Sequence, residues 1–201
     1  MKILIITAYF HPEKFKAQDI ALDLSKEHHV DVLTGIPNYP SGKFYKNYNL
    51  FSIFKLDKLQ DVNIFRTLIF PRGQNTINLI LNYLSLLFSF ILWSLFLRFL
   101  FYDKIIFIGY SPGILALTCL IYKKLFGKSP HLILWLQDFW PDDLISTGYF
   151  KKQSLLIKVN QIIMKFCYKS FDTLSTTSEL MSKELKKRSG ITNVLTIHNP
   201  I

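Results

Sequence analysis

The residues best suited to chemistry lie in the segment 135–143, with the sequence WLQDFWPDD. Three carboxylates and two indoles come directly at the end of the apolar run 131–136. Pro141 lacks an amide hydrogen and so ends a strand there, and in open α/β sheets ligands bind beyond the carboxyl ends of strands. We therefore predict Asp138 and Gln137 as catalytic residues, because a half-buried acid is costly unless it is paired or used.

Each of these side chains also has a purely structural interpretation. Asp138 could cap the next helix, Trp140 could fill the core, and Asp142 and Asp143 could be solvated on a loop. For a single residue the structural interpretation is the more common one. The pairing of Gln137 with Asp138 at a strand end is what favours function.

Two further loops carry polar residues at chemically useful positions. The first, HPEKFK at 11–16, offers an imidazole, an acid and two lysines where a helix begins. Lys14 and Lys16 could meet a phosphate, or could simply be exposed. The second, GIPNYPSG at 35–42, is dense in turn-forming residues directly after a strand, so it is either a loop at the same edge as Asp138 or a plain connection.

Alternating strands and helices must position these loops. The hydrophobic patterns predict strands at 2–7, 30–34, 62–67, 104–108, 132–136, 173–175 and 194–197, and helices at 18–27, 114–126, 155–169 and 179–188. This order implies right-handed crossovers and an α/β fold, a Rossmann-like doubly wound parallel sheet. We expect one domain over 1–201.

The composition favours a membrane surface over nucleic acid as a partner. The 201 residues are 50% hydrophobic and carry a net charge of +10, and basic nucleic-acid-binding chains are seldom so apolar. Cys119 and Cys167 each lie alone in an apolar helical pattern, so neither a metal nor a disulfide is indicated and a reducing cytosol fits. The segment 1–10 is typical of a buried strand rather than a signal peptide.

The apolar segment 78–101 holds a single charge, Arg98, and is long enough to span a bilayer. One span cannot be reconciled with strands of a single sheet on both sides of it. Its polar residues lie on one narrow helical stripe, Asn78, Asn82, Ser85 and Ser89. We expect this stripe to face the domain and the wide apolar face to dip into one leaflet. The alternative is a helix buried between the sheet and a partner domain.

A basic stripe on the helix 155–169 also favours a membrane. The lysines at this spacing are Lys151, Lys158, Lys165 and Lys169. We expect them opposite Leu155, Ile162 and Phe166. Each lysine near an anionic leaflet would add about 1 kcal/mol of attraction, although a solvated helix face would explain the stripe equally well.

Several common reaction chemistries lack their motifs. There is no G-x-G-x-x-G and no G-x-x-x-x-G-K-[ST], so the usual cradles for dinucleotides and nucleotide phosphates are missing and a nucleotide-dependent oxidoreductase is disfavoured. H-E-x-x-H, paired C-x-x-C and G-x-S-x-G are also missing.

The order of the motifs resembles the N-terminal half of glycosyltransferase family 4 enzymes. The similar pieces are KILIITAYFHPE at 2–13, VLTGIPNY at 32–39, QDFWPDD at 137–143, Thr147-Gly148, the segment 175–180 and IHNP at 197–200. The elements P-N-Y-P and Q-D-F-W-P are the most specific. They most resemble the branch that transfers N-acetyl-L-fucosamine-like sugars in O-antigen and capsule assembly.

The resemblance implies one half of a GT-B glycosyltransferase, in which two Rossmann-like domains face a cleft. The first domain holds the acceptor, the second holds the nucleotide sugar, and the anomeric configuration is retained without a metal or other cofactor. Asp138 would orient the acceptor hydroxyl or stabilise charge, where many relatives carry a histidine. The substrate-binding residues implied are His11, Glu13, Lys14, Lys16, Asn38, Tyr39, Trp140 and Asp142.

We therefore expect the acceptor-binding half of a retaining glycosyltransferase acting on a polyprenyl diphosphate-linked saccharide in surface polysaccharide biosynthesis. It would be peripheral or monotopic at the inner face of the bacterial cytoplasmic membrane. Because the chain ends at Ile201, where the family's chain would enter its donor-binding domain, we expect it to be a fragment or half of a split enzyme that is inactive alone. The alternative is a non-catalytic, membrane-associated Rossmann-like module.

Overall fold

The computed structural model describes residues 1–73, 75–97, 101–110, 112–125, 130–146, 148 and 151–199. Arg98, Thr147, Pro200 and Ile201 lie outside these residues, as does the side chain of Asp143. The statements below concern the described residues.

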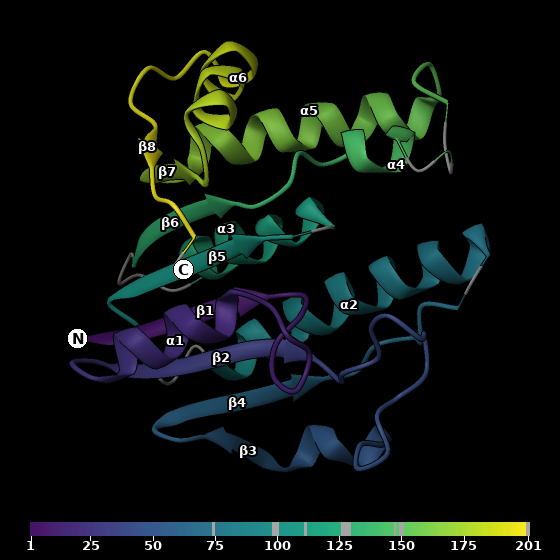
Figure 1. Cartoon of the computed structure of the whole chain (residues 1–201), viewed down its shortest axis with the longest axis vertical. Helices are drawn as coiled ribbons and strands as arrows, with labels where there is room; N and C mark the ends of the chain where they lie inside the picture. Colours follow the sequence, from purple (N-terminus) through teal and green to yellow (C-terminus); the bar gives the residue numbers. More distant parts are fainter. Residues whose placement is uncertain are drawn as a thin grey trace.

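Eight strands form one sheet in the order β3-β4-β2-β1-β5-β6-β7-β8, and every pairing is parallel except that of β3 with β4 (Figure 1). The strands are β1 Lys2–Thr7, β2 His29–Gly35, β3 Leu56–Leu59, β4 Val62–Thr67, β5 Lys104–Gly109, β6 His131–Leu136, β7 Thr173–Thr176 and β8 Leu195–Thr196. From β1 the chain adds β2, β4 and β3 toward one edge of the sheet. It then returns to place β5 on the other side of β1 and adds β6, β7 and β8 toward the opposite edge. The predicted α/β class with a Rossmann-like, mostly parallel sheet is thus confirmed.

The central strands are buried on both faces, which explains their continuous runs of branched residues. In β1, Leu4 and Ile6 pack into one hydrophobic cluster, whereas Ile3 and Ile5 pack into the other. The helices are α1 Ala17–Ser25, α2 Thr76–Leu97, α3 Leu117–Leu125, α4 Asp142–Ser146, α5 Leu155–Ser170 and α6 Glu179–Ser189, with 3-10 turns η1 Leu50–Phe54 and η3 Gly113–Ala116. Helix α1 covers one face of the sheet, and α2, α3 and α5 cover the other.

The sequence patterns did not predict three elements of the fold. Strand β3 is a short, charged edge strand, joined to β4 by a tight turn in which Gln60 has a φ of 52°. Helix α4 and the turn η1 are each only five residues long, too short for a helical period to show.

Helix α2 is oriented as the sequence predicts. Asn82 and Ser89 are buried, and Asn82 and Ser85 bond the backbone of Phe70, tying the helix to the segment after β4. The outer face carries a continuous line of exposed apolar side chains, Ile77, Leu81, Leu84, Phe88, Leu92, Leu95 and Phe96. We call this the α2 stripe. By length and composition α2 is the one described helix that could cross a membrane, a criterion that core helices also meet.

Helix α5 corrects one prediction. Its lysines do not lie opposite Leu155, Ile162 and Phe166, because these apolar residues are themselves 60–77% exposed. The face that packs on the sheet is instead formed by Ile157, Asn160, Met164, Cys167 and Tyr168. The exposed apolar line Leu155, Val159, Ile162 and Phe166, which we call the α5 stripe, therefore runs beside the exposed lysines rather than behind them.

Candidate functional site

The reversal of strand order places the carboxyl ends of β1 and β5 side by side, the position at which open α/β sheets bind ligands. Three loops lead out from this edge: 8–16 after β1, 36–49 after β2 and 137–141 after β6. Each contains a cis proline peptide bond, at His11–Pro12, Tyr39–Pro40 and Trp140–Pro141. All the sequence-predicted site residues lie in these loops or at the start of the helices that follow them.

Glu13 joins two of the loops. Its side chain is buried, and its carboxylate accepts hydrogen bonds from the amides of Asn38 and Tyr39 at 2.8 Å each and from Phe10 at 3.3 Å. Burial raises the pKa of Glu13 above its usual value, although these amides and Arg66 favour the charged form. Both carboxylate oxygens are therefore committed to the protein backbone, so Glu13 shapes the edge rather than meeting a substrate directly.

Asn38 also belongs to this scaffold. It is 3% exposed, donates to the carbonyl of Ile36 at 2.9 Å and accepts from the amide of Arg72 at 3.4 Å. Tyr39, by contrast, reaches the surface.

Four aromatic rings line the switch point. Tyr9 stacks on Phe15 with centroids 4.8 Å apart, and Tyr39 and Tyr110 contact Phe15 at 5.5 and 5.0 Å. Arg72 bonds the Tyr9 hydroxyl at 3.1 Å and lies over the Tyr39 ring. Burial raises the pKa of Tyr9 to about 12, so it is a neutral phenol at physiological pH. The cluster forms an apolar floor between the loop after β2 and the end of β5.

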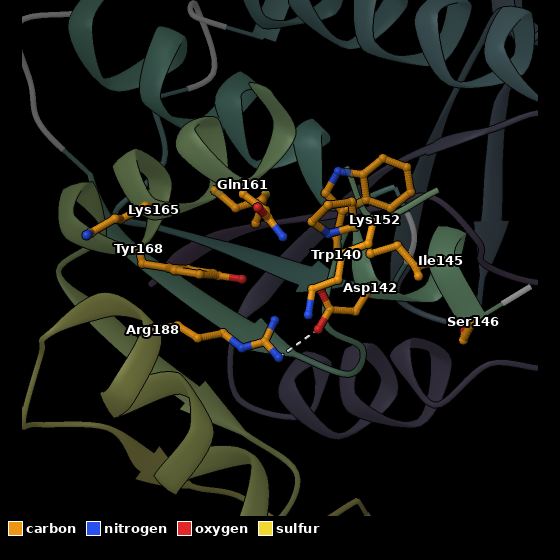
Figure 2. A pocket seen from close by; sticks show the side chains of 11 residues that line it. Trp140, Asp142, Ile145, Ser146, Lys152, Gln161, Lys165, Tyr168 and Arg188 are labelled. Atoms are coloured by element: carbon orange, nitrogen blue, oxygen red, sulfur yellow. Dashed lines mark ion pairs between the residues drawn. The ribbon is translucent and has the colours of Figure 1, made fainter. Parts of the chain in front are cut away.

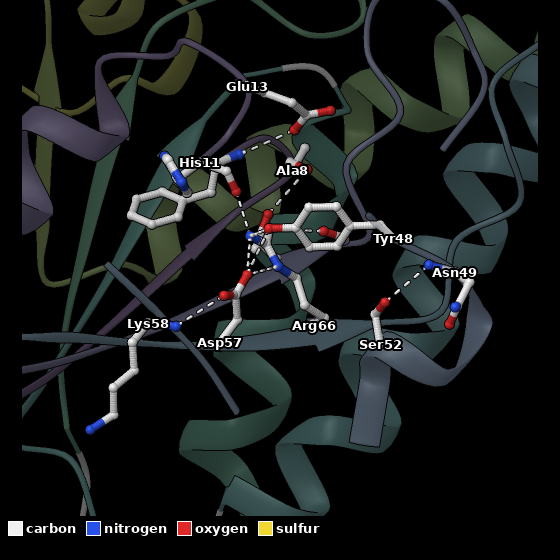
Figure 3. A network of polar contacts seen from close by, with 12 residues as sticks. Ala8, His11, Glu13, Tyr48, Asn49, Ser52, Asp57, Lys58 and Arg66 are labelled. Atoms are coloured by element: carbon white, nitrogen blue, oxygen red, sulfur yellow. Dashed lines mark hydrogen bonds and ion pairs between the residues drawn. The ribbon is translucent and has the colours of Figure 1, made fainter. Parts of the chain in front are cut away.

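Beyond this floor lies a polar network centred on Arg66 (Figure 3). Arg66 is fully buried on β4; it pairs with Asp57 at 2.8 Å and donates to the carbonyls of His11 and Gly35. Tyr48 donates to Asp57 at 2.9 Å. Burial would raise the pKa of Asp57, but the bonds from Arg66 and Tyr48 outweigh it and hold that pKa below its usual value.

The network forms the wall of a pocket of about 560 Å³. Most of its lining is polar, and the half-buried His11 is on its rim together with Tyr45, Lys46, Asn47, Asn49, Ser52 and Lys55. Amides, hydroxyls and aromatic rings of this kind suit a polyhydroxylated ligand. We call it the His11 pocket.

Gln137 and Asp138 lie at the end of β6, where both their amides bond the carbonyl of Gly109 on β5. Asp138 is exposed, yet partial burial raises the pKa of its carboxyl above the usual value. Its charge also acts on Tyr110, whose pKa burial raises to about 12. Asp138 and Tyr110 therefore share one neighbourhood at the switch point.

The side-chain nitrogen of Gln137 is buried and has no hydrogen-bond partner within the described residues. The Tyr110 hydroxyl faces the backbone amides of Lys16 and Ala17, whose hydrogen bonds act against the rise in its pKa. Buried polar groups are normally bonded, so the Gln137 nitrogen next to an exposed acid sets this strand end apart from a plain loop.

Trp140 and Asp142 follow Asp138 closely in the chain. Trp140 is 4% exposed, and its indole N–H donates to Asn160 at 3.1 Å, so it is packed into the core as the structural interpretation has it. Asp142 pairs with Arg188 at 2.6 Å. Both nevertheless line a cavity of about 540 Å³ between α4, α5 and α6 (Figure 2).

The two lysines of the first loop are on the surface. Lys14 is exposed, and Lys16 is exposed and pairs with Asp19 at 3.6 Å. Across the described residues, no group of three or more His, Cys, Asp or Glu side chains is placed to hold a metal ion.

Sequence reasoning missed Arg66, Asp57 and Tyr110. An arginine inside a predicted buried strand was a usable signal, because a buried charge needs partners. Asp57 and Tyr110 carry no such signal, since their roles depend on a hairpin and a strand order that only the fold reveals.

No family model matches the chain, and no curated protein matches it either.

Proposed function

We propose that this chain is the acceptor-binding half of a retaining glycosyltransferase of the GT-B type, which transfers a sugar from a nucleotide sugar to a lipid-linked saccharide in surface polysaccharide assembly. The observation that carries the proposal is the unpartnered, buried side-chain nitrogen of Gln137 next to the exposed Asp138, at the carboxyl end of β6 beside the switch point of the sheet. An acceptor sugar could supply the missing partner there.

The chemistry follows from these two side chains. An acceptor hydroxyl would donate to the Asp138 carboxylate and accept from the Gln137 amide, which fixes the oxygen that attacks the anomeric carbon of the donor. The bond from that carbon to the nucleoside diphosphate would break, and the diphosphate would leave with the proton of the hydroxyl. The carboxylate would also stabilise the positive charge that develops at the anomeric carbon. The remaining sugar rings of the acceptor would extend toward the His11 pocket, and a second domain would hold the nucleotide sugar.

The two apolar stripes support a lipid-linked acceptor. Exposed Leu, Ile and Phe side chains on α2 and α5 lie over the same face of the sheet, with lysines alongside, in a chain of net charge +10. That combination is typical of a protein lying at the surface of an anionic leaflet. We therefore propose that the chain lies at the inner face of the cytoplasmic membrane.

Acceptor binding can be tested with a soluble analogue, farnesyl diphosphate carrying N-acetylglucosamine, compared with farnesyl diphosphate by calorimetry. We expect the sugar to strengthen binding. Asp138→Asn should then lower the affinity for the sugar-bearing analogue roughly tenfold, the order of one hydrogen bond to a charged group. Glu27→Gln changes an exposed acid near the end of α1 and should have no effect. A sugar preference that survives Asp138→Asn would contradict the assignment, and binding with no sugar preference would favour the non-catalytic module.

Membrane binding can be tested by flotation with anionic liposomes. Leu84→Glu with Phe88→Glu changes side chains that are 55% and 64% exposed, so the fold should survive while flotation is lost. Phe51→Glu with Phe54→Glu is the matched control, because these exposed residues lie on η1, away from both stripes. Equal loss in both double variants, or no flotation of the wild type, would refute the membrane-facing role.

A further inference from the structure

Cationic side chains line the cavity between α4, α5 and α6. Lys152, Lys165 and Arg188 line it against a single described acid, Asp142. Within the described residues neither lysine forms an ion pair, whereas Arg188 is held by Asp142 at 2.6 Å and Glu184 at 2.7 Å. We call this the cationic cavity.

Neutral donors complete the cationic cavity. Figure 2 shows the Tyr168 hydroxyl, the Gln161 amide and the Arg188 guanidinium around one space. Burial raises the pKa of Tyr168 well above its usual value, so this hydroxyl keeps its proton and can donate. Lysines, an arginine and neutral donors around one cavity are the groups that bind phosphate in proteins.

A second, apolar pocket adjoins the cationic cavity at Trp140. It has a volume of about 80 Å³ and lies between the start of α2 and the start of α5. Its lining is Leu79, Ile80, Tyr83, Leu84, Ile114, Trp140, Leu144, Leu156 and Asn160. Leu84 is 55% exposed and belongs to the α2 stripe, and Leu156 is 37% exposed, so the pocket opens at the apolar surface.

Trp140 lines both spaces and is held firmly in place. Its ring packs edge-on against Tyr83 with centroids 5.3 Å apart, and its N–H is bonded to Asn160. On the other side, a Cβ added to Gly113 would lie 2.6 Å from the Cβ of Trp140, so backbone presses directly against it. The positions of the polar and apolar spaces are therefore fixed relative to each other before any ligand binds.

We propose that the two pockets together bind one lipid phosphate, with the phosphate in the cationic cavity and a single hydrocarbon chain in the apolar pocket. A pocket of about 80 Å³ suits the first carbons of one chain, as in an isoprenoid phosphate, rather than the two chains of a phospholipid, and the rest of the chain would lie along the apolar surface at Leu84 and Leu156. This inference rests on the proposed lipid-linked acceptor and identifies which residues hold its lipid part. Trp140, which lines both pockets, would lie beside the bond that joins phosphate to chain.

The test uses farnesyl phosphate, below its micellar concentration and without membranes, in calorimetric titrations of the full chain. Farnesol and inorganic phosphate are the two partial ligands. We expect each to bind at least roughly tenfold more weakly than farnesyl phosphate, because each leaves one pocket unused. Farnesol binding as tightly would overturn the phosphate site, and phosphate binding as tightly would overturn the chain site.

Matched variants locate the site. Lys152→Glu should weaken farnesyl phosphate roughly tenfold, the order expected for reversing one charge near a phosphate, while Lys151→Glu should not, because Lys151 is exposed next to it but does not line the cavity. Leu156→Asn should likewise weaken it and Leu155→Asn should not. Equal effects within either pair would refute the assignment.

A negative result in this experiment can be told apart from a failure of the proposed function. Farnesyl phosphate carries no sugar, and the assay contains no bilayer, so absent binding would remove the lipid-phosphate site and leave the sugar preference at Asp138 and the flotation result as they stand. Unfolding midpoints of the four variants within a few degrees of the wild type would show that a loss of binding is not a loss of fold.

Discussion

Replacing Glu13 by alanine should release the loop after β2 at a measurable cost in stability. The change removes the acceptor of two 2.8 Å bonds, from the amides of Asn38 and Tyr39, and of a longer one from Phe10. An unsatisfied buried donor costs about 1–3 kcal/mol. The Asn38 amide belongs to a 3% exposed residue and should cost near the top of that range, whereas Tyr39 is 37% exposed and water can reach it more easily.

The net loss of stability is smaller than the summed cost of these lost hydrogen bonds, because alanine also removes the cost of burying a carboxylate. That burial is what raises the pKa of Glu13. We therefore expect Glu13→Ala to lower the free energy of unfolding by about 2–3 kcal/mol at pH 7, measured by urea denaturation. Glu13→Gln keeps an oxygen for both short bonds and should cost about 1 kcal/mol or less. A loss below about 0.5 kcal/mol for alanine, or equal losses for both variants, would refute the bridging role.

Three other changes test the site. Asp57→Asn should lower the free energy of unfolding at pH 7, measured by urea denaturation. Because the pKa of Asp57 in the folded protein lies below its ordinary value of 3.8, this deficit should shrink below pH 3.8 and disappear once the pH falls below the folded pKa. Asp138→Asn should raise the thermal midpoint at pH 7, since burial raises the pKa of Asp138 and disfavours its charged form; this gain should fade as the pH falls toward 3.8, and a decrease at pH 7 would contradict it. Gly113→Ala should cost about 1–3 kcal/mol and shift the fluorescence of Trp140, whereas unchanged emission and stability would show that the contact yields easily.

The sheet could be predicted from the sequence because its strands are buried on both faces. The apolar run 2–7 matches β1 residue for residue, since a central parallel strand needs no alternation and ends where polar residues begin. The predicted range 62–67 also matches β4. Strand β3 could not be found in this way. Its sequence LDKL is half exposed at an edge, and its pairing depends on a turn rather than on burial.

The candidate site was predictable only to the level of loops. Spacing placed Glu13, Asn38 and Asp138 at one edge, because carboxyl ends of parallel strands share an edge. It could not tell which side chains point into a pocket and which hold the loops together. Glu13 and Asn38 turned out to bond backbone groups, a role that depends on the distance between two loops more than twenty residues apart in sequence.

The polar stripe of α2 predicted the orientation of the helix better than its mean hydropathy did. Taken alone, so apolar a helix predicts a membrane span, and the same pattern would suit a helix buried all round. Four polar residues on one stripe indicated which side faces the domain, and the bonds of Asn82 and Ser85 to Phe70 agree. On α5 the same reasoning failed. Lysines were assumed to oppose the apolar stripe, but long lysine side chains can flank exposed apolar residues as readily as they face solvent alone.

The placement of the two pockets links the lipid to the chemistry. A helix that returns from one parallel strand to the next starts near the carboxyl edge of the sheet, and both α2 and α5 follow this rule in Figure 1. The apolar pocket lies at the starts of both helices, and Trp140 is only two residues beyond Asp138. A lipid chain held there would enter at the edge of the sheet that carries Asp138, rather than at the far end of either stripe. A saccharide joined to that lipid through phosphate would then begin beside Asp138, so that one edge of the sheet would serve both the anchor and the reacting hydroxyl.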